Sequence, residues 1–308
     1  MKRLFQGLFL LFLLLGCAAA AAVYITPPPP QPPQLPPPPE TGAVSASVID
    51  GKSGIIYGEK QGDLRIYPAS TTKILTCILA LEEGRDKLDT DAVITPLAMG
   101  QDGTDLGIRP DVPLSLHELL YGMMLVSGND AAVSVAETVG GSYSRFVEMM
   151  NEKAAAAGAL YSHFANPNGL TDPLHYTTAN DMARIAAYAM KNPEFRAIVK
   201  EPVHKMVYRS GMYRVVENRN EFLTGGYAGA NGIKTGMTEA AGDCLVASAE
   251  RDGVLMIAAV YNDDNRWKDV EKWLDYGFAA EALQRQYEEA LAAEPPFYKW
   301  VNRQLGRE

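Results

Sequence analysis

Short apolar runs near both ends of the globular part of the chain predict β-strands. Residues 44–49 and 55–57 are two such runs, and a turn containing glycine separates them. Three more lie at residues 232–234, 244–249 and 254–261, the last two joined by a tight turn. We expect strands from both ends of the sequence to meet in one antiparallel sheet.

Helical periodicity occupies the middle of the chain. Ser115 and Glu118 form a capping box, which predicts a helix that continues through Met124. Further helices, several of them ended by glycine, are predicted at residues 74–81, 131–139, 144–157, 179–190 and 268–280. This order of elements indicates an α/β protein of the α+β type, in which a helical cluster packs on the antiparallel sheet.

The first residues have the charge and hydrophobicity pattern of an export signal. Lys2 and Arg3 precede an apolar run from Leu4 to Leu15. Residues 1–25 are therefore predicted to be a signal peptide or membrane anchor. We expect the protein to act outside the cytoplasmic membrane.

Three modes of attachment fit this segment. The sequence from Leu14 to Cys17 resembles a bacterial lipobox, in which the cysteine carries a lipid. The small residues at 18–22 also suit ordinary signal cleavage, which would release a secreted protein. Left uncleaved, Leu4 to Ile25 is long enough, at about 20 residues, to span a bilayer. A lipid anchor at Cys17 is the favoured hypothesis.

Composition divides the rest of the chain into three segments. Residues 26–41 are a Pro-rich linker, since ten of the thirteen residues from Pro27 to Pro39 are proline and favour an extended polyproline II spacer. The folded domain is expected at residues 42–280. A C-terminal tail follows at residues 281–308.

Charge and cysteine content narrow the class of protein. The 308 residues carry a formal net charge of −9, which argues against a nucleic-acid partner because such proteins need a basic surface. Cys77 and Cys244 are expected to be buried free thiols and not a disulfide, because a domain of this size needs no covalent staple.

Three short motifs carry the candidate chemistry. In chain order they are Ser70-Thr71-Thr72-Lys73, Ser127-Gly128-Asn129 and Lys234-Thr235-Gly236. Each motif alone is weakly informative, but the set in this order is typical of class A β-lactamases and penicillin-binding proteins.

The residue types suit acyl transfer through a serine. Ser70 needs a base to become a nucleophile, and Lys73 lies one helical turn away. The amine can act as that base only if its pKa falls, which burial and a second cation at Lys234 would both cause. Ser127 is expected to relay a proton to the leaving amine, and Asn129 to hold the substrate backbone.

The third motif suits a substrate that ends in a carboxylate. Lys234 supplies a positive charge and Thr235 a hydroxyl donor, and Gly236 allows the substrate backbone to approach the strand. The developing oxyanion needs backbone donors, for which we expect the N–H groups of Ser70 and Met237.

The chain resembles the low-molecular-mass penicillin-binding proteins of the serine-type D-alanyl-D-alanine carboxypeptidase family. The resemblance covers about residues 42–280. Besides the three motifs it includes Pro68-Ala69, residues 166–170, His175-Tyr176-Thr177-Thr178-Ala179 with Asp181, Gly232-Ile233, and Ala241-Gly242. It implies a β-lactamase/transpeptidase-like fold and removal of the terminal D-alanine from peptidoglycan stem peptides ending in D-Ala-D-Ala. It also implies covalent inhibition by β-lactam antibiotics, and neither a metal nor an organic cofactor.

Other functions share parts of this pattern. A serine β-lactamase would need an acid for rapid deacylation, yet the region holding Asn166 and Asn168 contains none before Asp172. A DD-endopeptidase or weak transpeptidase would use the same first step, and a non-enzymatic wall-binding protein would not need an intact Ser70 and Lys73.

Two further features were interpreted as structural. His163, His175 and His204 are expected to be hydrogen-bonded loop or surface residues. His117 precedes Glu118, but Tyr121 stands where a His-Glu-x-x-His zinc motif would need its second histidine. Family members often continue into a β-rich domain and an amphipathic membrane helix. Only about 28 residues follow the domain here, so we expect attachment through the N-terminus. The stripe Phe297, Val301 and Leu305 is expected to pack or fray.

Overall fold

The structure, a computed structural model, describes residues 26–307. The predicted export signal, Cys17 and the three modes of attachment lie outside the described residues. The chain divides into two compact units, of which the larger covers residues 37–279 and the smaller contains residues 26–36 with 280–307. Within residues 26–307 the helices are all too short or too polar to cross a membrane.

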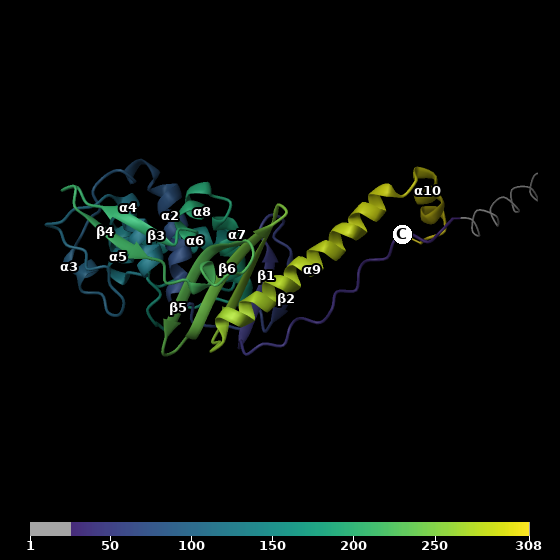
Figure 1. Cartoon of the computed structure of the whole chain (residues 1–308), viewed down its shortest axis with the longest axis horizontal. Helices are drawn as coiled ribbons and strands as arrows, with labels where there is room; N and C mark the ends of the chain where they lie inside the picture. Colours follow the sequence, from purple (N-terminus) through teal and green to yellow (C-terminus); the bar gives the residue numbers. More distant parts are fainter. Residues whose placement is uncertain (1–25, 308) are drawn as a thin grey trace, which may run out of the picture. The chain divides into compact units, whose positions relative to one another are not determined.

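The larger unit is built on a five-stranded antiparallel sheet with strand order β2-β1-β7-β6-β5 (Figure 1). The strands are β1 (Ser45–Asp50), β2 (Ile56–Lys60), β5 (Ala230–Thr238), β6 (Gly242–Arg251) and β7 (Val254–Tyr261). The first strand pairs with the last, from Ser45 opposite Tyr261 to Asp50 opposite Met256. The prediction of one sheet made from both chain ends is confirmed.

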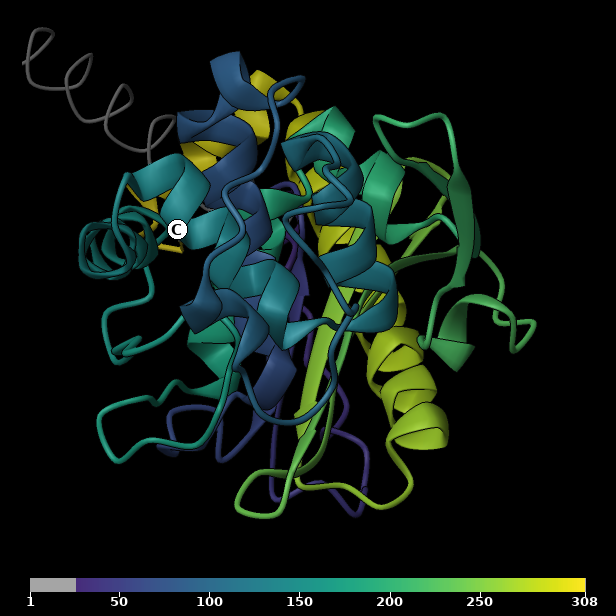
Figure 2. The same cartoon turned by 90° about the vertical axis from the view of Figure 1, so that its left-hand side faces the viewer.

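Alternate side chains of β7 pack into two different hydrophobic cores, one on each face of the sheet. Met256, Ala258 and Val260 face one core, whereas Ile257 and Ala259 face the other. The long helix α9 (Arg266–Ala293) covers the first face with its initial turns, and the helical cluster covers the second (Figure 2). Both faces of the sheet are therefore buried, which explains why residues 254–261 form an unbroken apolar run.

The predicted helices are present, and most differ from the predictions by a few residues at their ends. They are α2 (Lys73–Glu83), α4 (Leu116–Tyr121), α5 (Asn129–Gly140), α6 (Tyr143–Ala156), α7 (Ala179–Ala189) and α9. Only half of the capping box forms. Ser115 accepts from the Glu118 N–H, but the Glu118 carboxylate instead accepts from the Val207 N–H in a neighbouring strand.

Several short elements of the fold were not predicted from the sequence. These are α3 (Pro96–Met99), α8 (Pro193–Val199) and the strands β3 (Val203–Val207) and β4 (Tyr213–Glu217), which pair as a separate hairpin. The hairpin was missed because only one of its faces is buried, through Met206 and Val216. Helix α8 did carry a signal, since the Asn192 side chain caps it and Pro193 occupies its first turn.

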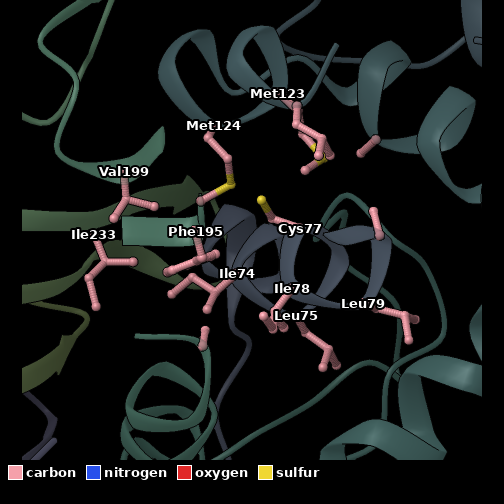
Figure 3. Close-up of a cluster of buried hydrophobic side chains, with 14 of the residues drawn as sticks. Ile74, Leu75, Cys77, Ile78, Leu79, Met123, Met124, Phe195, Val199 and Ile233 are labelled. Carbon is pink, nitrogen blue, oxygen red and sulfur yellow. The ribbon is translucent and has the colours of Figure 1, made fainter. Parts of the chain in front are cut away.

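Helix α2 is the centre of the main core. Ile74, Leu75, Ile78 and Leu79 are each at most 1% exposed, and Cys77 lies among the same apolar side chains (Figure 3). Cys77 and Cys244 are buried free thiols, as predicted. This packing fixes the helix that carries the Ser70 motif.

The smaller unit contains α10 (Pro296–Gln304), which carries the predicted C-terminal stripe. The stripe divides, because Val301 is buried whereas Phe297 and Leu305 are exposed. The Asn302 side chain donates to the carbonyl of Pro27 at 3.3 Å, so residues from both ends of the chain meet in this unit.

Candidate active site

Ser70 lies in a tight 3-10 turn, η1 (Ala69–Thr72), that leads directly into α2. The turn is fixed by Thr71, whose backbone N–H and hydroxyl both donate to the Pro68 carbonyl, at 3.2 and 2.6 Å. The Thr71 hydroxyl also lies 3.1 Å from the Tyr261 hydroxyl on the sheet. The nucleophile is thereby attached to both a helix and the central sheet.

The amine of Lys73 lies against three oxygen atoms. Its Nζ is 2.9 Å from Ser70 Oγ, 2.8 Å from Asn129 Oδ1 and 2.6 Å from the carbonyl oxygen of Asn168. The amide and carbonyl oxygens can only accept, and a neutral amine has two N–H groups and one lone pair. Two N–H groups on these oxygens leave the lone pair for the Ser70 hydroxyl, which is the geometry of a general base.

Burial favours the neutral form of this amine. Lys73 has 0% exposure, and desolvation lowers its pKa well below 10.5. The positive charge of Lys234 lowers the pKa further, while the carboxylate of Asp130 acts in the opposite direction. The predicted coupling of Lys73 to Lys234 is therefore present in the structure.

Ser127 stands at the end of a widened helical turn. The predicted helix through Met124 in fact ends at Tyr121 and continues as a π-helical turn, η3 (Gly122–Val126). Ser127 then adopts left-handed backbone angles, φ 71° and ψ 31°, which are strained for a residue with a Cβ. This break in the helix presents Ser127 to a surface cavity that Ser70 also lines. Its relay role stays a prediction.

The side chain of Asn129, which was predicted to contact the substrate, is buried and bound to other parts of the protein. Its Oδ1 accepts from Lys73, and its Nδ2 donates to the carbonyl of Asp102 at 2.7 Å. Only 6% of the residue is exposed. The amide therefore orients the Lys73 amine in this structure, and a direct contact with substrate stays a prediction.

Strand β5 brings the third motif to the nucleophile. A Cβ added at Gly236 would lie 3.1 Å from the Ser70 nitrogen and 3.1 Å from the Ala69 Cβ. Glycine thus favours close packing of the strand on η1, in addition to the approach of substrate expected from the sequence.

Lys234 is a second buried cation. It is 2% exposed, and its Nζ donates to the Thr235 carbonyl at 3.2 Å. Burial lowers its pKa from 10.5 to about 7, with further contributions from the charges of Arg219 and Arg266. A bound carboxylate would supply the missing negative charge and restore the ammonium form.

The three motifs meet at a cavity of about 190 Å³. Its lining consists of Ser70, Thr104, Ser127, Arg219, Thr235, Gly236, Met237 and Arg266. Two cations and no carboxylate belong to this lining, so among the described residues the cavity wall is electrostatically suited to an anion. Ser70 and Met237 share the cavity, but the oxyanion role of their N–H groups stays a prediction.

Thr104, Arg219 and Arg266 were not predicted as site residues from the sequence. Arg266 donates to the carbonyl of Gly236 at 3.0 Å and to Asp243 at 2.9 Å, and Arg219 donates to Thr104 Oγ1 at 3.2 Å. Arginine and threonine are common surface residues, and no local motif marks these positions. Only the fold brings them to the motifs.

Asp130 organises the loop that carries Thr104. Its carboxylate accepts from the backbone N–H groups of Leu106, Gly107, Ile108 and Ala131 at 2.8 to 3.1 Å. The residue is only 2% exposed, so these four donors replace its hydration. Asp130 was not predicted as a site residue, although its position directly after the second motif could have indicated it.

Comparison with known proteins identifies relatives of this site and fold. The family model described as D-alanyl-D-alanine carboxypeptidase matches residues 33–265. D-alanyl-D-alanine carboxypeptidase DacF of Bacillus subtilis is 32% identical over 250 residues, which cover 77% of this chain and 62% of that protein. DacB2 of Mycobacterium tuberculosis is 36% identical over 242 residues, covering 75% and 81%.

Two further similarities bear on the type of reaction. A D-alanyl-D-alanine endopeptidase of Pseudomonas aeruginosa is 30% identical over 250 residues, covering 77% of this chain and 79% of that protein. The crystal structure of the Streptomyces K15 DD-transpeptidase superimposes with a TM-score of 0.73 at 30% identity, covering 79% of this chain and 99% of that one. The expected β-lactamase/transpeptidase-like fold, an antiparallel sheet with helices, is confirmed.

Proposed function

Because this chain belongs to the D-alanyl-D-alanine carboxypeptidase family, we propose that it removes the terminal D-alanine of peptidoglycan stem peptides. The reaction proceeds through an acyl-enzyme on Ser70, and β-lactam antibiotics acylate the same oxygen. The observation that carries the proposal is the desolvated Lys73 amine, 2.9 Å from Ser70 Oγ.

Acylation begins when Ser70 Oγ attacks the carbonyl carbon of the penultimate D-alanine and its proton passes to the Lys73 amine. The oxyanion is stabilised by the N–H groups of Ser70 and Met237. When the C–N bond breaks, Ser127 gives its hydroxyl proton to the departing D-alanine and takes the proton held by the Lys73 ammonium, which becomes a neutral amine again. Water then attacks the ester: its oxygen bonds to the acyl carbon, one of its protons passes to Ser70 Oγ as the ester bond breaks, and the shortened peptide leaves.

The substrate carboxylate is recognised by the cationic end of the cavity. Lys234 and Thr235 supply a charge and a hydroxyl donor, and Arg219 and Arg266 add positive potential from two other segments. Binding of a carboxylate raises the pKa of Lys234 because it opposes the desolvation of the ammonium. Affinity and protonation of this lysine are therefore linked.

Asn166 and Asn168 lie in the region where a class A β-lactamase would carry the Glu that activates water for deacylation. Asparagine at these positions favours a peptidase over a β-lactamase. Asn168 gives its carbonyl to Lys73, and the Asn166 side chain binds within the loop, accepting from the Gly169 N–H at 2.7 Å. Neither offers a carboxylate that could activate water for fast hydrolysis of a penicilloyl ester. We expect slow release of penicillin.

A DD-endopeptidase or transpeptidase activity is the second candidate. Relatives with these names share about 30% identity with this chain. Cleavage of a cross-link or transfer to an amine would begin with the same acyl-enzyme, so the two activities differ only in the peptide bound and in the acceptor.

We further propose that the enzyme acts on the outer side of the cytoplasmic membrane and is tethered there through its N-terminus. The support is the apolar run after Lys2 and Arg3, with Cys17 as the candidate lipid attachment site. The Pro-rich linker would hold the catalytic domain, proposed at residues 42–280, away from the lipid.

The test is mass spectrometry of the protein after exposure to penicillin, combined with an assay of D-alanine release from a stem pentapeptide. A stable adduct on Ser70 with release of D-alanine supports the carboxypeptidase, and Ser70→Ala should abolish both. An adduct without release of D-alanine would favour the second candidate. Rapid turnover of penicillin would indicate a β-lactamase.

A further inference from the structure

His175 is a hydrogen-bonded loop residue, as predicted, and it is buried with 1% exposure. Its Nε2 lies 2.8 Å from the hydroxyl of Thr72, and its Nδ1 lies 2.9 Å from the backbone nitrogen of Ala165. The ring of Phe164 packs edge-on against the imidazole at 5.5 Å. The histidine therefore joins two segments that are about 90 residues apart.

These contacts fix the tautomer of the imidazole. A backbone N–H can only donate, so Nδ1 must accept from Ala165 and carries no proton. The ring hydrogen is then on Nε2 and donates to Thr72 Oγ1. A neutral histidine with this tautomer satisfies both edges of the ring, whereas an imidazolium would direct a second donor at the Ala165 N–H.

The two segments joined by His175 hold the reacting groups. Thr72 lies between Ser70 and Lys73 in the sequence. Ala165 begins the loop whose Asn168 carbonyl accepts from Lys73 at 2.6 Å. We define residues 165–169 as the lysine-holding loop.

The lysine-holding loop fits α2 and η1 closely at other points. Thr76 Oγ1 donates to the Pro167 carbonyl at 2.6 Å. A Cβ at Gly169 would come within 1.9 Å of the Ala69 carbonyl oxygen, so the backbones are in direct contact. A displacement of this loop would move the Asn168 carbonyl away from the Lys73 amine.

We propose that neutral His175 is a positioning residue that ties the lysine-holding loop to the nucleophile's helix and so keeps the Lys73 amine directed at Ser70. The inference rests on the proposed function, because it assigns the residue to the acylation step. His175 does not line the cavity and has no contact with substrate in this role.

Protonation of His175 provides a pH-dependent readout of this role. Burial lowers its pKa from 6.5 to about 4; Asp172 opposes this, and His163 and Lys73 add to it. The unfolded chain thus binds the proton more readily than the folded one between about pH 6.5 and 4. The contribution of the neutral ring to the free energy of unfolding is complete above about pH 6.5 and is lost as the pH falls toward about 4.

The experiment compares His175→Phe and His175→Gln with the parental protein and with His163→Phe, a matched change at an exposed histidine outside this contact. The rate constant for acylation by penicillin is measured, with the KM for a stem peptide and the melting temperature. We expect His175→Phe to slow acylation about 100-fold, the effect of a small misplacement of a catalytic group. KM should stay near the parental value because Lys234 and Thr235 are untouched.

Gln offers an acceptor and a donor at similar positions, so His175→Gln should recover most of the rate. It should also retain activity at about pH 4 better than the parental protein, because His175 is protonated there whereas Gln does not titrate. His163→Phe should acylate at the parental rate. Parental rates in both His175 variants would overturn the inference alone, whereas an unreactive parental protein would overturn the proposed function and the inference with it.

If His175→Phe fails to fold, two other measurements test the inference. They are the activity of His175→Gln at acid pH and the ¹⁵N NMR spectrum of the labelled imidazole in the parental protein. A spectrum at neutral pH with the proton on Nε2, together with the better acid tolerance of His175→Gln, supports the inference. A proton on Nδ1 would overturn it.

Discussion

Replacing Lys234 by Met should stabilise the protein while it removes activity. The side chain is buried, and desolvation lowers its pKa from 10.5 to about 7. At about 1.4 kcal/mol for each tenfold change in acidity, the ionised form is disfavoured by roughly 5 kcal/mol in the folded protein. Relaxation and water entry reduce this value, so we expect Lys234→Met to raise the free energy of unfolding by about 1–4 kcal/mol.

The gain should depend on pH in a defined direction. Below about pH 7 the lysine is charged in both states, and the full desolvation cost is present. Between about pH 7 and 10.5 the folded protein releases the proton and the unfolded chain keeps it, so the cost declines by about 1.4 kcal/mol per pH unit. The advantage of the Met variant should therefore be greatest below pH 7 and small near pH 10.

Urea unfolding of both proteins at about pH 6.5 and 9.5 measures this difference, and acylation by penicillin measures the loss of function. Lys234→Arg is the matched control, since it keeps the charge and should give no stability gain. A Met variant that is less stable than the parental protein at pH 6.5 would refute the claim that Lys234 is a desolvated cation held in place for function.

Three further predictions concern neighbouring groups. Lys73→Ala should slow acylation of Ser70 by penicillin about 10⁴-fold in stopped-flow or gel assays, the upper range for loss of a general base; a parental rate would remove Lys73 from its role. Asp130→Asn should lower the free energy of unfolding by about 2–4 kcal/mol in urea titration, because its amide nitrogen would face the Gly107 and Ile108 N–H donors. It should also move the acid limb of acylation to lower pH, since Asp130 raises the pKa of Lys73; an unchanged limb would contradict that coupling. A stem peptide amidated at its C-terminus should lose more than about 100-fold in kcat/KM in an amine-release assay, since the buried cation would stay unpaired; equal kcat/KM values would contradict recognition of the carboxylate.

The residues that share a local motif were accessible from the sequence. Ser70 and Lys73 are one helical turn apart, and Lys234 to Gly236 lie at the end of the strand predicted at residues 232–234. Apolar runs and helical patterns also predicted β1, β7 and α2 with errors of only a few residues. These features depend on neighbours in the chain, so pattern and spacing are enough to recognise them.

The supporting groups depend on contacts between distant segments. The imidazole of His175 reaches Thr72 across 103 positions, and Arg266 reaches Gly236 across 30. Single histidine, arginine and aspartate residues have no periodicity of their own, and their role follows from which backbone groups the fold places beside them. The contact of Gly236 with the Ser70 turn was likewise invisible until β5 was placed against η1.

The central claim is that Lys73 is a neutral amine that accepts the proton of Ser70. It is tested most directly by the pH dependence of the rate constant for acylation by penicillin, with the adduct mapped to Ser70 by mass spectrometry. The account predicts a plateau at neutral pH and an acid limb far below 10.5, the ordinary pKa of a lysine. A rate that keeps rising tenfold per pH unit toward 10.5, or an adduct on another residue, would contradict it.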